Sequence, residues 1–247
     1  MQLKTDGLVI REYSVGENDR VITVLTRDYG IIRAFANGAK RLKSRSQSAT
    51  QLLAYSSFVF YQGRDSYSVN EAKSKEIFFK LREDIEKLSL AQYFCELAGE
   101  LGPEMDRADD YLKLILNTLH FLAKDSRPQL MLKAVLELRM MSLAGYMPDL
   151  TACDHCGNFE DAGMFFEKEK GLLVCCKCGS GGRAVTASVL AAMRHICYSD
   201  FVKLFNFTLS DEALECLSVL TEAYLKAHIQ KNFKTLDFYK SLAQLKL

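Results

Sequence analysis

The feature that most constrains this chain of 247 residues is a pair of Cys-x2-Cys motifs in its second half. Cys153 and Cys156 form the first motif, and Cys175 and Cys178 form the second after eighteen intervening residues. Each motif makes a turn that directs two sulfurs to one side, and two facing turns supply the tetrahedral thiolates that zinc prefers. The spacing predicts one structural Zn²⁺ per chain. Because protein ligands fill all four positions, no position is open for water or substrate.

Two neighbouring residues offer alternative ligands. Cys176 can take the place of Cys175, and His155 can replace a thiolate. We prefer Cys175 because it keeps the two-residue spacing, and we expect the ring of His155 to point away from the metal. Iron fits the same four thiolates, and free or oxidised thiols are the alternative to any metal. The other three cysteines lie in apolar segments of helical period, where we expect core positions: Cys95, Cys197 and Cys216.

The chain shows no signal for export or membrane insertion. Residues 1–6 lack the apolar core of a signal peptide, and no run approaches the ~18 apolar residues of a membrane span. We therefore expect a cytoplasmic protein that does not bind a membrane. In that reducing compartment, eight cysteines favour metal binding or free thiols over disulfides.

The first 79 residues have the pattern of a small β domain. Five short runs rich in Val, Ile, Phe and Tyr are separated by Asn, Asp and Gly turn signals. A long connection, 37–55, separates the third run from the fourth, as in a five-stranded OB barrel. An SH3-like barrel is the nearest alternative. The five runs are 7–11, 20–26, 30–36, 57–61 and 67–72.

Residues 80–247 change to a helical period. Three amphipathic segments between residues 80 and 147 are bounded by proline, and 186–200 and 210–230 predict two more helices. The cysteine motifs lie between these two groups, in an insertion at about 150–182 that includes a small hairpin. The sequence therefore predicts an α+β protein of two domains. Residues 1–79 form an OB-like barrel, and residues 80–247 form an all-α domain with an inserted zinc module.

The net charge of +1 conceals a segregation of charge along the chain. Residues 1–80 hold 13 Lys and Arg against 8 Asp and Glu, whereas residues 81–160 hold 8 against 14. Between 29 and 64 there is no acidic residue at all. The cations of this stretch that we assign to nucleic acid are Arg33, Lys40, Arg41, Lys43 and Arg45.

Basic side chains that follow phosphates are how OB domains hold single-stranded nucleic acid. The alternative is a solvated basic loop. Five aromatic residues of the same stretch are expected in the barrel core, because strands bury Phe and Tyr. These are Phe35, Tyr55, Phe58, Phe60 and Tyr61.

No pattern of a catalytic site accompanies these features. The chain lacks a phosphate-binding glycine loop, a G-x-S-x-G elbow and an H-E-x-x-H motif, and its four histidines are scattered. We predict a protein without catalytic residues. A zinc-stabilised scaffold that binds proteins but not DNA remains the alternative function.

Taken together, the order of parts resembles the RecO family of bacterial DNA repair proteins, which are recombination mediators. The resemblance spans nearly the whole chain: 6–10, 21–26, 29–30 and 38–44 in the barrel, 153–156 and 171–178 around the cysteines, and 224–236 near the end. It implies an OB-fold DNA-binding domain and a helical domain with a zinc module. It also implies a location in the bacterial cytoplasm, associated with the nucleoid.

The resemblance further implies partners. These are single-stranded DNA and double-stranded DNA, the C-terminal tail of single-strand-binding protein, RecR and, indirectly, RecA. The implied role is to anneal strands and, with RecR, to help RecA onto DNA coated by single-strand-binding protein. Lys133 and Arg139 are conceivable basic residues at the rim of a groove for the acidic tail, although ordinary solvated positions explain them equally well.

Overall fold

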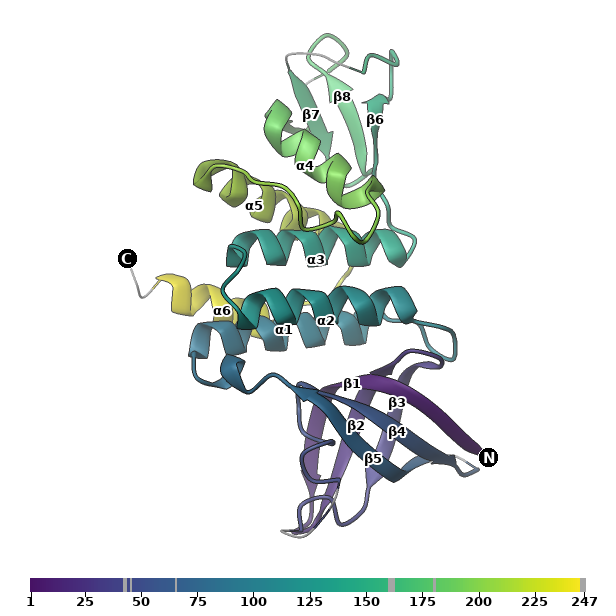
Figure 1. Cartoon of the computed structure of the whole chain (residues 1–247). Coiled ribbons are helices and arrows are strands. Elements are labelled where there is room, and N and C mark those ends of the chain that lie inside the picture. The colour runs from purple at the N-terminus through teal and green to yellow at the C-terminus, as the bar shows by residue number, and fades with distance from the viewer. Residues whose placement is uncertain (42–43, 45, 65, 160–162, 180, 245–247) are drawn as a thin grey trace. The chain divides into compact units, whose positions relative to one another are not determined.

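The computed structural model describes all residues except 42–43, 45, 65, 160–162, 180 and 245–247. Its contacts divide the chain into two compact units (Figure 1). The first unit comprises Met1–Lys124 together with Phe233–Leu247, and the second comprises Asp125–Asn232. The predicted domain boundary after residue 79 is a statement about independent folding. Contacts within the two units do not test it, so it stays a prediction.

Five strands of the first unit close into a barrel in the order β1-β2-β3-β5-β4, as an OB-like fold requires. The prediction of a five-stranded OB-like barrel is confirmed, although the first and last strands, β1 and β5, are longer than the apolar runs that predicted them. Neighbouring strands are antiparallel except β3 and β5, which are parallel. The bounds are Gln2–Val15 (β1), Asp19–Thr26 (β2), Gly30–Ala36 (β3), Ala54–Gln62 (β4) and Tyr67–Ile77 (β5).

Alternation along the strands separates a barrel interior from an outer surface. Ile22 and Ile32 point into the core, and Phe58 stacks on Phe60 there with ring centroids 5.1 Å apart. The expected burial of Phe58 and Phe60 is confirmed. It is wrong for two other aromatic residues, because outward positions of their strands leave Phe35 46% and Tyr61 53% exposed.

The helices of the first unit include the last one of the chain, which returns after the second unit. Asp84 caps α1 by accepting from the backbone N–H groups of its first turn. Tyr93 of α1 meets Phe233, just before α6, edge to face at 5.7 Å. This ring contact anchors the returning segment. The bounds are Phe79–Arg82 (η1), Ile85–Leu101 (α1), Asp109–Ala123 (α2) and Lys234–Gln244 (α6).

Gly30 joins the barrel to the loop after α1. Its φ is +63°, and the next N–H, that of Ile31, donates to Pro103 O over 2.9 Å. A Cβ at residue 30 would lie 2.0 Å from that same carbonyl oxygen. Both the left-handed backbone and the close approach therefore require glycine.

The described residues of the second unit form three helices and a small sheet of order β6-β8-β7-β9. Strands β7 and β8 form the predicted hairpin between the cysteine motifs. In the described part of the chain, no helix combines the length and apolar character needed to cross a membrane. The bounds are Gln129–Leu143 (α3), Ala187–Tyr198 (α4), Asp211–His228 (α5), Asp149–Cys153 (β6), Met164–Glu167 (β7), Leu172–Cys175 (β8) and Arg183–Val185 (β9).

A buried ion cluster joins α3 to α5. Lys133 Nζ lies 2.9 Å from Glu137 and 3.1 Å from Glu222, and Thr221 donates to Glu137 over 2.6 Å. Lys133 is only 2% exposed, so the idea that it forms the rim of a surface groove is wrong. Arg139 is also engaged, because its guanidinium donates to backbone carbonyls at the end of α4.

Candidate functional site: a four-cysteine centre and a basic barrel loop

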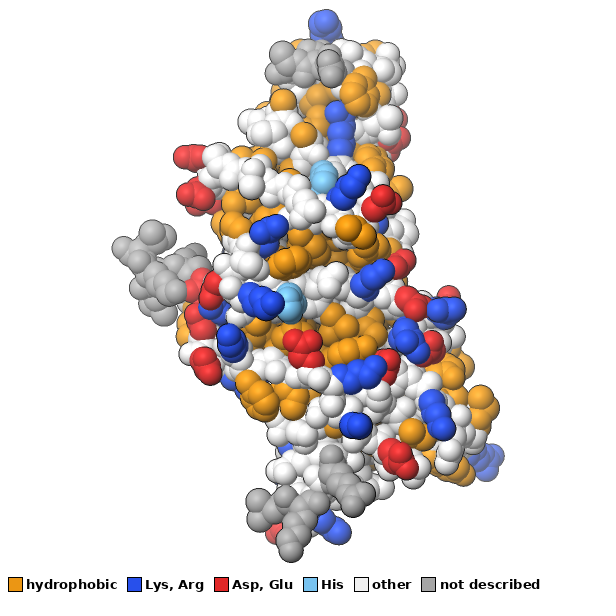
Figure 2. Space-filling view, in the orientation of Figure 1, with side chains coloured by type: hydrophobic (Ala, Val, Ile, Leu, Met, Phe, Trp, Pro, Cys, Tyr) orange, Lys and Arg blue, Asp and Glu red, His pale blue; other side chains and the backbone are white. Residues whose placement is uncertain are grey.

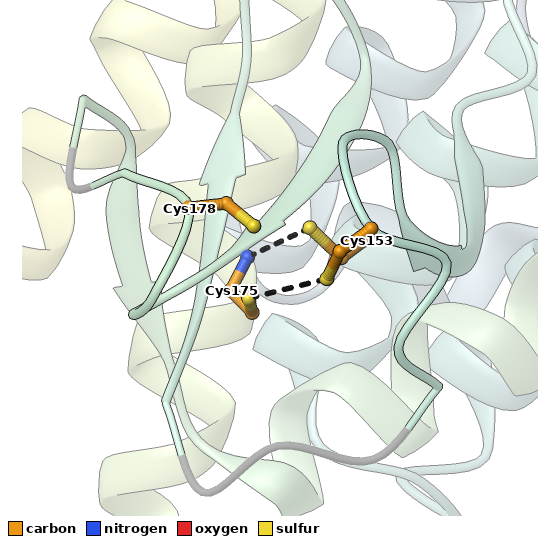
Figure 3. A group of neighbouring side chains, drawn as sticks. Cys153, Cys175 and Cys178 are labelled. Atoms are coloured by element: carbon orange, nitrogen blue, oxygen red, sulfur yellow. Dashed lines mark hydrogen bonds between the residues drawn. The ribbon is translucent and has the colours of Figure 1, made fainter.

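The four predicted cysteines come together at one point of the second unit (Figure 3). Their sulfurs all lie within 4.8 Å of one another, and the sulfurs of Cys156 and Cys175 are 3.7 Å apart. Four thiolates around one zinc, each at about 2.3 Å, would place their sulfurs about 3.8 Å apart. The arrangement of Cys153, Cys156, Cys175 and Cys178 therefore fits a tetrahedral metal ion.

Backbone turns hold the sulfurs in position. The Gly157 N–H donates to Cys153 O over 2.8 Å, and the Cys178 N–H donates to Cys175 O over 3.0 Å. Gly157 has a φ of +69°, a backbone conformation that glycine adopts without strain. The Cys175 N–H also donates to Cys153 Sγ over 3.3 Å, which links the two motifs.

The surroundings of the four sulfurs give the thiols different pKa values. The hydrogen bond from the Cys175 N–H lowers the pKa of the Cys153 thiol to about 6. The neighbouring sulfurs of Cys156 and Cys175 raise the pKa of the Cys178 thiol to about 12. Four negative charges cannot share this volume without a cation between them, so the site is suited to a divalent metal.

The two alternative ligands lie outside this group. Cys176 is exposed beside the cluster, and its N–H donates to Gly163 O over 2.8 Å. His155 is exposed as well. Among the described residues, the candidate metal ligands that come together are the four cysteines of the two Cys-x2-Cys motifs.

Side chains that sequence reasoning missed join the cysteine module to its helices. Arg194 of α4 donates to Leu150 O over 2.7 Å, and its guanidinium lies 4.3 Å from the ring of Phe159. Tyr224 of α5 packs against Phe166 at 5.5 Å between ring centroids. Apolar period marked these helices, and the family resemblance included residue 224, but neither signal indicated the contacts that Arg194 and Tyr224 make.

The second group of predicted site residues lies in and after β3 of the barrel. Arg33 is exposed on the outer surface of β3, and Arg41 is exposed at the start of the following loop. Lys40 is half-buried. Its N–H donates to Asn18 O over 2.9 Å, which holds the loop against the β1–β2 turn. Lys43 and Arg45 lie outside the described residues.

Charges of both signs are mixed on the face of the molecule that Figure 2 shows. Lys and Arg side chains there stand beside Asp and Glu side chains. On this face the charges are therefore mixed rather than uniformly positive. The excess of Lys and Arg in the barrel domain lies in the part of its sequence without carboxylates, from 29 to 64.

The fold and the sites together define a class: proteins that combine an OB-like barrel with a helical unit carrying a four-cysteine module that could hold a metal ion. Two family models cover the chain. The one described as "Recombination protein O N terminal" matches residues 1–78, and "Recombination protein O C terminal" matches residues 82–237. The chain belongs to the recombination protein O (RecO) family.

Curated relatives agree over nearly the full length. The chain is 36% identical to a DNA repair protein RecO of Acetivibrio thermocellus, over 99% of this chain and 98% of the relative. It is 31% identical to that of Alkaliphilus metalliredigens, over 98% and 100%, respectively. It is 30% identical to that of Symbiobacterium thermophilum, over 96% of each.

Proposed function

We propose that the protein is a non-catalytic mediator of DNA repair and homologous recombination that binds single-stranded DNA, and double-stranded DNA as well, through its barrel. Membership of the RecO family carries this proposal. It is supported by relatives that bear the name DNA repair protein RecO. It is also supported by the OB-like barrel, a fold that commonly binds oligonucleotides.

The proposed DNA contacts are the basic residues around the loop after β3. Arg33 and Arg41 have exposed side chains, and Lys40 belongs to the same loop. Lys43 and Arg45 complete the set on the strength of their place in the sequence. Clustered cations without acidic neighbours repel one another, and a polyanion relieves that repulsion.

The finer role follows from the family. We propose that the protein anneals complementary strands and, with RecR, helps RecA load onto DNA coated by single-strand-binding protein, whose acidic C-terminal tail it binds. The cell compartment that suits this role is the cytoplasm, at the nucleoid. The surface for the tail must be sought away from Lys133, which is buried in an ion cluster.

We further propose that one Zn²⁺ is held by the four thiolates and serves the fold alone. The bound ion would neutralise the sulfurs and cross-link the two cysteine motifs. The distances between the sulfurs support this assignment. With four protein ligands, a catalytic water has no place at the metal.

A titration of a labelled oligonucleotide at two salt concentrations tests DNA binding. Single-strand affinity should fall steeply as salt rises, because bound phosphates release counterions. Reversing the charge of Lys40, Arg41, Lys43 and Arg45 together should weaken binding to all sequences alike. It should also reduce the slope of log affinity against log salt by about 3, at about 0.7 per lost phosphate contact.

A matched control reverses four exposed lysines that lie on helices of the first unit or cap one: Lys113, Lys124, Lys234 and Lys240. This variant changes the net charge by the same amount and should retain most of the affinity. Equal loss in both variants would show a non-specific charge effect. No binding by the wild-type protein, together with salt-insensitive capture of a protein partner, would favour the scaffold function. Repeating the titration with single-strand-binding protein, with and without its tail, tests the proposed partner.

A further inference from the structure

Two aromatic rings stand on the outside of the barrel, where a strand residue is usually polar. Tyr13 of β1 is 51% exposed and Phe35 of β3 is 46% exposed. Both lie opposite Val21 of the intervening strand β2, so all three side chains share the outer face. Val21 is only 5% exposed and forms the floor between the rings.

Two arginines form the neighbouring row of the same face. Arg11 lies opposite Thr23, and Thr23 lies opposite Arg33. Each arginine is therefore two residues along its strand from a ring, at a spacing of about 6.6 Å. Both are exposed, and no hydrogen bond or ion pair among the described residues engages either guanidinium. We call Arg11, Tyr13, Arg33 and Phe35 the outer barrel face.

A β-bulge creates this alignment. The register of β1 against β2 shifts between Val9 and Arg11, so Val9 faces the core and the odd-numbered residues after the bulge face outward. Glu12 then lies opposite the core residue Ile22, and its carboxylate accepts from the Leu52 N–H over 3.1 Å. The carboxylate of this strand segment is therefore directed away from the arginines.

The carboxylate of Asp19 is also engaged. Asp19, at the start of β2, accepts from the Gly38 N–H over 2.6 Å. This bond holds the start of the basic loop beside the β1–β2 turn, next to the end of β3. Lys40 and Arg41 of the loop thus continue the positive charge of the outer barrel face.

From this juxtaposition we infer that the outer barrel face is a stacking platform for unpaired DNA bases, with Tyr13 and Phe35 against bases and Arg11 and Arg33 against phosphates. The inference rests on the proposed function and specifies its site and binding mode. An aromatic ring stacks on any base whose face is free, and a duplex offers such faces only at its ends. The platform therefore selects single-stranded over double-stranded DNA without selecting sequence.

The test compares two probes of equal length, an oligo-dT and an abasic oligonucleotide that has the same phosphates but no bases. Wild-type protein should prefer oligo-dT. In the variant Tyr13→Ser/Phe35→Ser, affinity for oligo-dT should fall by about fivefold or more for each lost stacked base, whereas affinity for the abasic probe stays unchanged. The preference for bases should disappear. A variant that keeps the full preference would overturn the platform.

Phe79 supplies a matched control. It is 56% exposed in the same unit and also has an arginine close to its ring, that of Arg82 at 5.6 Å. Phe79→Ser removes an equally exposed ring away from the outer barrel face and should leave both affinities unchanged. An equal loss of base preference in this variant would also contradict the platform.

A gain-of-signal variant guards against misfolding of the double variant. The chain has no tryptophan, so Phe35→Trp introduces a unique fluorophore and keeps an aromatic ring in place. Its fluorescence should be quenched by oligo-dT and not by the abasic probe, and Phe79→Trp should respond to neither. Absence of quenching at residue 35 while oligo-dT is bound would exclude stacking there.

The outcomes separate the platform from the proposed function. If the four-residue loop variant loses binding and the ring variants do not, DNA binding stands and the platform is wrong. If the wild-type protein binds neither probe, both fail.

Discussion

The four-cysteine centre and the outer barrel face are encoded in opposite ways. The cysteines lie within 26 residues, and two short turns bring their sulfurs together. The outer barrel face draws on two strands that are aligned only through a third, and on a bulge that sets which residues point outward. A site of the first kind depends on local turns, and one of the second kind depends on the closed barrel. Each should therefore respond to different substitutions.

The largest expected effect comes from substitutions in the four-cysteine centre. Cys153→Ser/Cys156→Ser should reduce metal content from about one zinc per chain to none. The stability of the second unit should fall by an amount on the order of 10 kcal/mol, because binding of a structural zinc is coupled to folding. Elemental analysis and hydrogen exchange check both results. Oligonucleotide affinity of the first unit should persist.

Cys176→Ser is the control for the metal prediction. This exposed thiol lies outside the ligand group, so zinc content and hydrogen exchange should remain those of the wild type. A loss of zinc in this variant would show that Cys176 is a ligand. Unchanged folding of the wild-type protein after strong chelation would contradict a structural metal.

The second effect concerns the helices that carry the cysteine module. Lys133→Met should lower the free energy of unfolding by about 3–5 kcal/mol, because it leaves Glu137 and Glu222 buried without their common cation. Denaturant titration measures the loss. Lys133→Met/Glu137→Gln should recover part of it. Lys226→Met, at the exposed end of the cluster, should cost less than about 1 kcal/mol.

The third effect concerns the stability of the barrel. Gly30→Ala should destabilise the first unit by about 2–4 kcal/mol, since a Cβ there would meet Pro103 O at 2.0 Å and the residue keeps a positive φ. Thermal unfolding, followed by the signals of backbone amides in the barrel, measures this loss of stability. Zinc content should not change. Gly16→Ala, where nothing lies near the added Cβ, separates the cost of φ from that of the clash.

The smallest effect tests how firmly the module is attached to its own unit. Arg194→Met should cost about 1–2 kcal/mol, because it removes the hydrogen bonds to the carbonyls of Leu150 and Thr151. Hydrogen exchange should increase in β6 while the four thiolates still bind zinc. Arg183→Met, at an exposed position of β9, should change neither quantity. Loss of zinc from Arg194→Met would show that the centre is not local.

Several features could be predicted because local patterns dictate them. The thiolate set follows from turn geometry, and the β7–β8 hairpin follows from two apolar runs around a charged turn. Strand and helix periods gave the five barrel strands and the five helices before α6. These predictions needed no knowledge of distant contacts.

Other features escaped prediction because distant segments decide them. Lys133 reads as a solvated residue on a helix, but partners on α5, far along the chain, help to make its burial tolerable: its ammonium group pairs with Glu222 and donates to Ser218. Phe35 and Tyr61 read as core residues, as Phe58 and Phe60 do, yet they are exposed. Alternation divides a strand into two faces without stating which one is inside.

By itself, the sequence determined which four cysteines come together, the order of β and α parts, and the acid-free basic stretch, since each depends on residues near one another in the chain. Tertiary structure alone decided that Tyr13 and Phe35 stand outside the barrel beside Arg11 and Arg33. The physical reason is register. A bulge after Val9 and the closure of five strands choose the inner face, and both arise from pairing between strands rather than from any one strand.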